Sequence, residues 1–257
     1  MLRLENISKV FKPNTVDEKA LFSDFSFVAE KGEFISVIGS NGSGKTTMLN
    51  IISGEVKPDS GKVILGGTDI TSQKDYVRSK RIARVYQDPS QGTCPTMTIL
   101  ENMSIADNKG KRFGLGRGLN TKRADYYKTR LEVLGMGLEN RLGTQTGSLS
   151  GGQRQALALI MATLKTPDVL LLDEHTAALD PKSADIVMKL TDEIVKGENI
   201  TTIMVTHNLR YAAEYGSRTV MMHDGKAIMD IRGNDKKNNS VNDYLNVFNS
   251  ISIECGN

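Results

Sequence analysis

Apolar and polar residues alternate along Leu2–Ile7 and again along Leu21–Val28. This alternation predicts half-buried β-strands, because successive side chains of a strand point to opposite faces. Phe34–Ile38 is a short run that is typical of a buried strand. A glycine-rich loop follows it and leads into Thr46–Ile52, where the pattern indicates the start of a helix. We therefore expect strands, a loop and a helix in that order.

Strand-like runs are absent from Asp88–Thr146, where the pattern changes. Within this stretch, Tyr126–Met136 carries apolar residues among lysines and arginines at helical spacing, which predicts an amphipathic helix. We interpret the stretch as a helical insertion.

Strand patterns return at Val169–Leu172 and Thr201–Val205, with a helical pattern across Ser183–Val195 between them. An Asp224-Gly225 pair flanked by apolar residues predicts a β-hairpin. The polar tail is expected to be helical from Ser240.

The composition is that of an ordinary globular protein of 257 residues, 39% hydrophobic and 25% charged. These values exclude disordered and fibrous proteins. The longest apolar runs, such as Ala156–Leu164, are well short of the roughly 20 residues that cross a bilayer. The N-terminus lacks the apolar core of a secretory signal, so we expect a cytosolic protein that reaches a membrane only through partners.

The net charge of +3 comes from 33 basic and 30 acidic residues and does not indicate binding of nucleic acid. The densest basic cluster runs from Lys109 to Lys128 and includes Arg112 and Arg117. Two interpretations stay open: a solvated loop that leads into a helix, or a contact with lipid headgroups or a partner. Cys94 and Cys255 lie in no metal-binding pattern, so we expect two free thiols.

The glycine-rich loop fits the pattern of a phosphate-binding loop. Its residues are Gly39, Ser40, Asn41, Gly42, Ser43, Gly44, Lys45, Thr46 and Thr47. The glycines let several amide N–H groups point at one spot, and the following helix adds the positive end of its dipole. We expect Lys45 to reach the β- and γ-phosphates of a nucleotide and the Thr46 hydroxyl to bind Mg²⁺.

Asp173 and Glu174 follow the apolar run Val169–Leu172, at the end of a predicted buried strand. Asp173 is expected to bind Mg²⁺ directly or through water, because the carboxyl ends of strands in a doubly wound sheet lie beside the phosphate loop. Glu174 points elsewhere by alternation and can orient and deprotonate the attacking water. His207 and Gln87 would be unremarkable alone. His207 follows the predicted strand Thr201–Val205 and could contact the γ-phosphate. Gln87 ends a further predicted short strand, Ile82–Tyr86, and its amide oxygen could ligate Mg²⁺.

A second anion site is expected where another helical pattern begins. Its residues are Ser150, Gly151, Gly152 and Gln153. A nest of amides at a helix N-terminus binds anions, but one chain needs only one such cradle per triphosphate. A head-to-tail dimer resolves this, because each such site would then cap the γ-phosphate held by the other copy.

Leu149-Ser-Gly-Gly-Gln, taken in order with the phosphate loop, the acidic strand end, Gln87 and His207, resembles the ATP-binding subunits of ATP-binding-cassette (ABC) transporters. The resemblance runs from Met1 to about Asp230. It implies an α/β fold: a P-loop nucleotide-binding core with a mixed, largely parallel sheet, an antiparallel β subdomain and a helical insertion. One ABC ATPase domain is expected over residues 1–257, with 1–87 and 165–257 forming the RecA-like core and β subdomain, and about 88–164 the helical signature subdomain.

The resemblance also implies roles for further residues. Phe11 would stack on adenine, where the family usually has Tyr. Asp180 would lie in the loop that communicates between the two sites of a dimer. The residue after Glu174 is commonly Pro in the family and is His175 here. Asp173–Pro181 is similar to a subgroup of bacterial importers whose cargo includes amino acids, among which aromatic ones are plausible.

The implied mechanism is that two ATP molecules, each with Mg²⁺, join two copies of the chain, and that hydrolysis releases them. Gln87–Ser104 would transmit this motion to a separate transmembrane permease, and an extracytoplasmic solute-binding protein would deliver the cargo. The chain would then be cytoplasmic and peripheral on the inner face of the cell membrane.

An alternative is a soluble ABC-type ATPase that acts on nucleic acid or ribosomes. Such proteins usually carry a long coiled coil or a second cassette, and the sequence shows neither. A nucleotide sensor without turnover would predict loss of hydrolytic residues, whereas Lys45, Asp173, Glu174 and His207 are all present.

Overall fold

The computed structural model describes residues 1–111 and 118–254. Arg112 and Arg117 of the basic cluster, and Cys255, lie outside the described residues. The chain divides into two compact units. The first unit comprises Met1–Arg78 and the described part of Asn199–Asn257, and the second unit comprises Ser79–Glu198.

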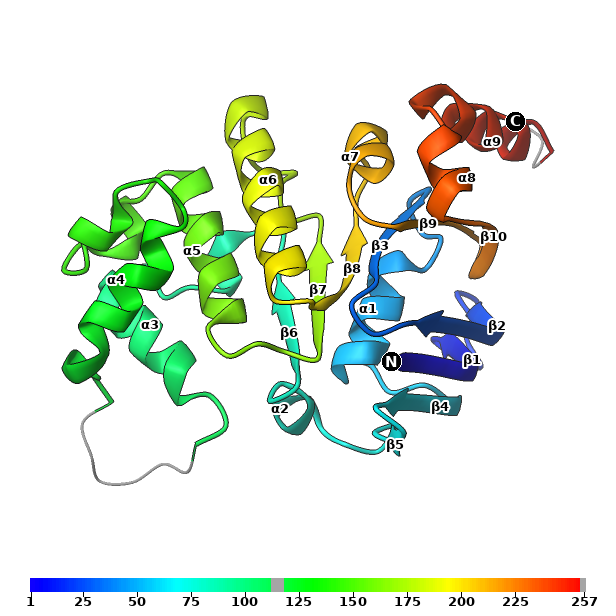
Figure 1. The fold of residues 1–257 in the computed structure, drawn as a ribbon. Coiled ribbons are helices and arrows are strands. Elements are labelled where there is room, and N and C mark those ends of the chain that lie inside the picture. Colours follow the sequence, from blue (N-terminus) through cyan, green and yellow to red (C-terminus); the bar gives the residue numbers. More distant parts are fainter. Residues whose placement is uncertain (112–117, 255–257) are drawn as a thin grey trace. The chain divides into compact units, whose positions relative to one another are not determined.

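The first unit contains the predicted phosphate loop (Figure 1). Its elements are β1 (Leu2–Phe11), β2 (Lys19–Ala29), β3 (Phe34–Gly39), α1 (Lys45–Ser53), β4 (Ser60–Leu65), β5 (Thr68–Asp69), α2 (Asp75–Arg78), β8 (Thr201–Val205), α7 (Leu209–Glu214), β9 (Arg218–His223), β10 (Lys226–Arg232), α8 (Gly233–Asn238) and α9 (Val241–Glu254).

An antiparallel sheet in the order β2-β1-β4-β5 forms one part of the first unit. Leu2 and Leu4 of β1 are buried at alternate positions, and Ile7 is buried after a register shift between Leu4 and Ile7. The alternation read from the sequence is therefore that of a sheet with one solvated face.

A mixed set of strands in the order β10-β9-β3-β8 forms the other part of this unit. The central strand β3 is buried along its whole length and pairs in parallel with both β8 and β9. β9 and β10 form the hairpin predicted at Asp224-Gly225. The helices α7 and α9 contribute Ala212 and Tyr244 to a core cluster with Ile38 and Met221, which holds β3 in place.

A buried arginine ties three strands of the first unit together. The Arg218 guanidinium on β9 donates to both carboxylate oxygens of Asp230 on β10, at 2.7 and 2.6 Å, and to the Val28 carbonyl on β2. Its side chain is only 4% exposed, so the ion pair with Asp230 compensates a charge that water barely reaches.

The second unit contains the predicted acidic strand end and the helical insertion (Figure 1). Its elements are β6 (Ile82–Val85), η1 (Pro89–Gln91), α3 (Ile99–Asn108), η2 (Thr121–Arg123), α4 (Ala124–Glu132), η3 (Leu138–Asn140), η4 (Thr146–Ser148), α5 (Gly151–Thr163), β7 (Val169–Asp173) and α6 (Pro181–Gly197). β6 and β7 pair in parallel, and α5 packs against both α3 and α6.

The helix predicted over Tyr126–Met136 begins and ends earlier than its apolar pattern. α4 starts at Ala124 and ends at Glu132. Gly135 and Gly137 have φ values of 60° and 74°, which turn the chain out of the helix. Leu134 and Leu138 are nevertheless buried, so the apolar pattern continues through a turn.

The basic residues on both sides of the undescribed segment share one buried carboxylate. Asp107, whose side chain is 2% exposed, pairs with Lys111 at 3.4 Å and Arg123 at 3.2 Å and accepts a hydrogen bond from the Tyr127 hydroxyl. Two members of the predicted basic cluster therefore neutralise an internal charge.

The predicted fold class, an α/β fold with parallel and antiparallel strands and a helical insertion, is confirmed. The boundaries 1–87, 88–164 and 165–257 remain predictions, because the second unit also includes β6, β7 and α6. No helix of the described residues is long and apolar enough to cross a membrane. Cys94 is a free thiol, as expected.

Candidate functional site

The phosphate loop joins the end of β3 to the start of α1 within the first unit. Gly44 precedes the helix with a φ of 104°, and a Cβ there would lie 2.9 Å from the Phe22 ring. A Cβ at Gly39 would lie 2.2 Å from the Met222 carbonyl oxygen. Both positions therefore require glycine, because the backbone approaches its neighbours too closely for any side chain.

Lys45 folds back over its own loop. Its Nζ donates hydrogen bonds to the carbonyl oxygens of Gly39 and Ser40, both at 2.8 Å, and the residue is 5% exposed. The loop is thus closed by the side chain that was expected to reach the phosphates.

One buried atom in this loop fits a phosphate group. Ser43 Oγ is buried and has no hydrogen-bond partner among the described residues. Hydroxyl groups in protein interiors are normally paired. An unpaired hydroxyl inside a glycine-rich loop beside a helix N-terminus is a donor suited to a phosphate oxygen.

Three other predicted residues of the first unit are exposed. Thr46 lies in the first turn of α1, and Phe11 ends β1 at 37% exposure with Lys9 Nζ 5.7 Å from its ring centre. His207 follows β8 by two residues, directly before the α7 N-cap Asn208. Each is accessible to a ligand.

Asp173 ends β7 in the second unit and forms a close ion pair. Arg84 on β6 donates from its guanidinium to Asp173 Oδ2 at 2.5 Å, with side-chain exposures of 8% and 13%. The same guanidinium lies 4.7 Å from the centre of the Tyr86 ring. Sequence reasoning missed Arg84, although a charged residue on a buried strand was a usable signal.

Glu174 has a backbone conformation that the strand pattern of the sequence did not predict. Its φ is 48°, in the left-handed region that residues other than glycine rarely adopt. The Ala177 amide donates to the Glu174 carbonyl at 2.8 Å and closes a tight turn. Such strained positions are concentrated at functional sites.

Asp180 is the N-cap of α6. Its carboxylate accepts a hydrogen bond from the Ser183 amide at 3.0 Å, and Pro181 occupies the first helical position. Hydrogen bonds from Ser183 lower the pKa of Asp180, so the residue is ionised. The cap fixes where the loop after Glu174 ends.

Ser150 and Gln153 form a reciprocal cap at the start of α5. Ser150 Oγ accepts from the Gln153 amide at 3.3 Å, and Gln153 Oε1 accepts from the Ser150 amide at 3.2 Å. Gly151 and Gly152 are the first two residues of the helix, where amide N–H groups have no partner within the helix. The arrangement supplies oriented donors for an anion.

The two glycines of the signature, as we call Leu149–Gln153, also lie against the loop and helix that follow Glu174. A Cβ at Gly152 would lie 3.0 Å from Ser183 Cβ, and one at Gly151 would lie 3.3 Å from Leu179 Cδ2. The start of α5 and the start of α6 therefore pack in direct contact, which a larger residue at Gly152 would disturb.

Two further residues hold the signature in place and were missed by sequence reasoning. Arg154 donates to the carbonyl oxygens of Thr146 and Gly147, at 3.1 and 2.8 Å. Gln155, fully buried, donates to the Tyr86 carbonyl at 2.9 Å, next to Gln87. The exposed Gln87 therefore follows a backbone segment that is fixed to the signature helix.

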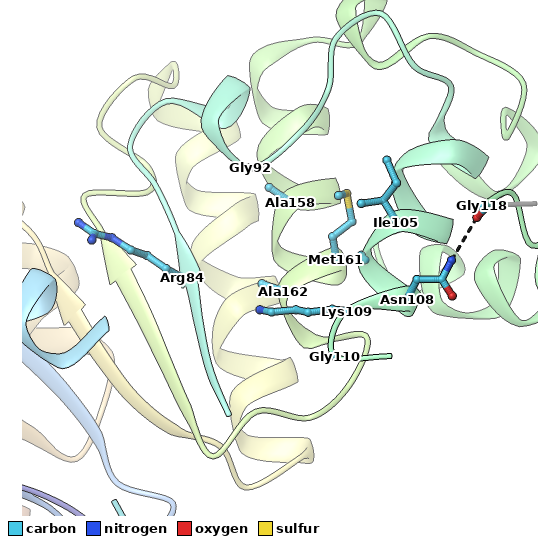
Figure 2. Close-up of a pocket in the computed structure, with 11 residues that line it drawn as sticks. Arg84, Gly92, Ile105, Asn108, Lys109, Gly110, Gly118, Ala158, Met161 and Ala162 are labelled. Atoms are coloured by element: carbon cyan, nitrogen blue, oxygen red, sulfur yellow. Dashed lines mark hydrogen bonds between the residues drawn. The ribbon is translucent and has the colours of Figure 1, made fainter. Parts of the chain in front are cut away.

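A cavity of about 430 Å³ lies in the second unit between β6, α3 and α5. Figure 2 shows Ile105, Ala158 and Met161 around it, with the Arg84 guanidinium pointing away from them. Ile105 is 54% exposed, so the cavity has an accessible apolar residue directly after the segment Gln87–Ser104.

The comparisons with known proteins agree with these motifs. A family model described as ABC transporter matches residues 22–177. A tyrosine transport ATP-binding protein of Clostridioides difficile (strain R20291) is 49% identical over 96% of this chain and 98% of the relative. An energy-coupling factor transporter ATP-binding protein of Clostridium tetani (strain Massachusetts / E88) is 32% identical over 89% of this chain and 78% of the relative.

Solved structures of ATP-binding cassettes have the same fold. A dimeric cassette in a post-hydrolysis state, bound to ADP and Pi, is 28% identical over 90% of this chain and 98% of its own, with a TM-score of 0.76. A cassette of an ABC transporter in its ADP conformation is 27% identical over 100% and 99%, with a TM-score of 0.81. The chain therefore belongs to the ABC transporter family, as an ATP-binding subunit that hydrolyses ATP.

Proposed function

We propose that the chain is the motor subunit of an importer of amino acids, with tyrosine or a similar aromatic amino acid as cargo. The observation that carries this proposal is the 49% identity, over nearly the full length of both chains, to a protein whose name states tyrosine transport. The aligned region covers 96% of this chain and 98% of that protein, so the similarity is not limited to the nucleotide-binding motifs.

ATP would be held by the phosphate loop, with Phe11 against the adenine. The amides of residues 40–47, the orphan hydroxyl of Ser43 and the Lys45 ammonium suit the charges and oxygens of a triphosphate. Binding would require Lys45 to exchange its two carbonyl partners for phosphate oxygens. The phosphate oxygens would then replace the two hydrogen bonds that Lys45 gives up.

Mg²⁺ fits the oxygen donors of Thr46, Gln87 and Asp173, since hard cations prefer hydroxyl, amide and carboxylate oxygens. When bound, the ion would neutralise charge that develops on the transferred phosphoryl group. In the structure without the ion, Arg84 already forms an ion pair with Asp173. Arg84 would therefore compete with the ion for one carboxylate oxygen.

Glu174 would act as the general base toward water, and His207 would donate a hydrogen bond to the γ-phosphate. The left-handed φ of 48° at Glu174 supports a role separate from that of Asp173, because the chain leaves the strand direction at this residue. Glu174→Gln is expected to bind ATP and to lose turnover.

Ser150, Gly151, Gly152 and Gln153 would complete the ATP site of a second copy. The uncompensated amides at the start of α5 fit a γ-phosphate, and the dimeric cassette among the similar structures supports a pair of chains as the working unit. Asp180, ionised and close in sequence to Glu174, would carry signals between the two sites of that dimer.

A separate membrane permease would contact the apolar cavity beside Ile105, which would place the chain at the cytoplasmic face of the membrane. An extracytoplasmic solute-binding protein would deliver the amino acid to that permease. Ile105→Asp should abolish binding to the permease and leave ATP hydrolysis of the isolated chain intact. Val133→Asp is the matched control, because Val133 is equally exposed at 54% and does not line the cavity.

Transport is the decisive test of the cargo. Tagged chain purified from its own membranes in mild detergent, with the proteins that accompany it, is reconstituted into vesicles with ATP and Mg²⁺ on the side of the motor. We expect ATP-dependent accumulation of labelled tyrosine that Lys45→Ala abolishes and that excess glutamate does not inhibit. Absence of a copurifying permease, or transport that ignores aromatic amino acids, would contradict the proposal.

A further inference from the structure

The residue after Glu174 is a buried histidine bonded to the next helix. His175 is 1% exposed, and its Nε2 lies 3.2 Å from Oγ1 of Thr191 on α6, which is fully buried. Both groups are in the second unit, so this contact is internal to one compact body.

The direction of this hydrogen bond follows from the partners of the threonine. The Thr191 hydroxyl donates its only proton to the Val187 carbonyl at 2.8 Å, one turn earlier in α6. Thr191 Oγ1 can therefore only accept from His175, which makes Nε2 the protonated nitrogen of the ring. The His175 ring therefore donates one specific hydrogen bond to α6.

This bond lies beside the strained residue. Glu174 has its φ at 48°, and a turn bond from the Ala177 amide holds its carbonyl. The covalent link to His175 and the bond to Thr191 then fix the next peptide unit to α6. A residue other than glycine keeps a left-handed conformation only when surrounding contacts hold its backbone in place. The Ala177 amide and the His175–Thr191 hydrogen bond are two such contacts for Glu174.

The other end of the same helix packs on the signature. α6 begins at the Asp180 cap, and Ser183 in its first turn lies against Gly152 at the start of α5. The helix therefore contacts the signature at its first turn and the Glu174 turn through Thr191. These are the parts of one chain that, in the proposed dimer, serve two different ATP molecules.

We propose that His175 is a positioning residue for ATP hydrolysis. Its hydrogen bond to Thr191 sets the orientation of the Glu174 carboxylate relative to α6, and through α6 relative to the signature. This inference rests on the proposed role of Glu174 as general base. It assigns no contact of His175 with ATP, so its effect falls on turnover and not on nucleotide binding.

Two pairs of variants distinguish the loss of this hydrogen bond from a change in side-chain volume or polarity. Thr191→Val removes the acceptor, and Thr191→Ser keeps it. His175→Gln places an amide nitrogen at about the reach of Nε2, whereas the shorter His175→Asn places it near Nδ1. Steady-state kcat and KM for ATP are measured on the full chain, together with ATP-driven dimerisation of each change in a Glu174→Gln background.

We expect Thr191→Val and His175→Asn to lose about tenfold in kcat, the effect of one hydrogen bond of ordinary strength. KM and dimerisation should be unchanged, and Thr191→Ser and His175→Gln should stay near the wild-type kcat. Wild-type kcat in Thr191→Val overturns the inference, as does a loss that appears equally in dimerisation. Rapid turnover by Glu174→Gln refutes the proposed base, whereas an inactive Glu174→Gln beside a normal Thr191→Val refutes only the role of His175.

Discussion

The ion pair between Arg84 and Asp173 gives a measurable prediction about the proposed metal ligand Asp173. Arg84→Met keeps the length of the side chain and removes its charge. The two side chains are 8% and 13% exposed and 2.5 Å apart, so little water is available to replace the guanidinium. The variant leaves the Asp173 carboxylate in the protein without this cation.

The expected cost follows from burial. Removing one partner of a fully buried ion pair costs about 3–5 kcal/mol, and the remaining access of water to Asp173 reduces this to about 2 kcal/mol. Replacing both groups is nearly neutral, because no uncompensated charge remains. Arg84→Met should thus be clearly less stable than wild type, and Arg84→Met with Asp173→Asn should recover most of the loss.

Urea unfolding of the full chain in EDTA, without nucleotide, measures these differences as shifts of the transition midpoint. Adding Mg²⁺ should raise the midpoint of Arg84→Met more than that of wild type, because the ion would replace the positive charge that the substitution removes from beside Asp173. Equal midpoints for Arg84→Met and the double variant would refute the reasoning. They would show that the Asp173 charge is not balanced by Arg84.

Two further changes test packing and charge elsewhere. Gly152→Ala should destabilise the chain by about 1–3 kcal/mol through its 3.0 Å contact with Ser183 Cβ, and Ser183→Gly should restore the melting temperature. Asp230→Asn should lower the free energy of unfolding, measured with urea, by about 2 kcal/mol, because the buried Arg218 guanidinium loses the negative charge and one of the two acceptor oxygens of its partner. Burial raises the pKa of Asp230, but the hydrogen bonds and charge of Arg218 outweigh it and hold the pKa below 3.8. The ionised Asp230 stabilises the wild type fully at pH values above its ordinary pKa of 3.8, and this stabilisation is lost as the pH falls through the lower pKa of the folded protein. Asp230→Asn should therefore lack this part of the destabilisation by acid.

Elements that depend on a short sequence motif could be predicted from the sequence. The phosphate loop, the strand that ends at Asp173, the hairpin at Asp224-Gly225 and the helix start at Ser150 all depend on residues within one short stretch. The spacing of Ser150 and Gln153 is itself that of a capping box, and the structure shows both of its hydrogen bonds.

Contacts between distant residues could not be predicted in this way. Arg84 is 89 residues from Asp173, and nothing near Arg84 indicates which acid it meets. Thr191 is 16 residues from His175, and the apolar pattern of its helix does not indicate that this position accepts a hydrogen bond. The end of α4 was misplaced because burial continues past Gly135 while the backbone leaves the helix.

Mixing two inactive variants tests most directly whether the signature of one chain completes the ATP site of another. Lys45→Ala disables the phosphate loop and keeps the signature, and Ser150→Phe does the reverse. In a head-to-tail dimer of the two, one site combines an intact loop with an intact signature. We predict that each variant alone is inactive and that their mixture recovers ATP hydrolysis. A mixture as inactive as its parts would contradict the account, because each chain would then build its site alone.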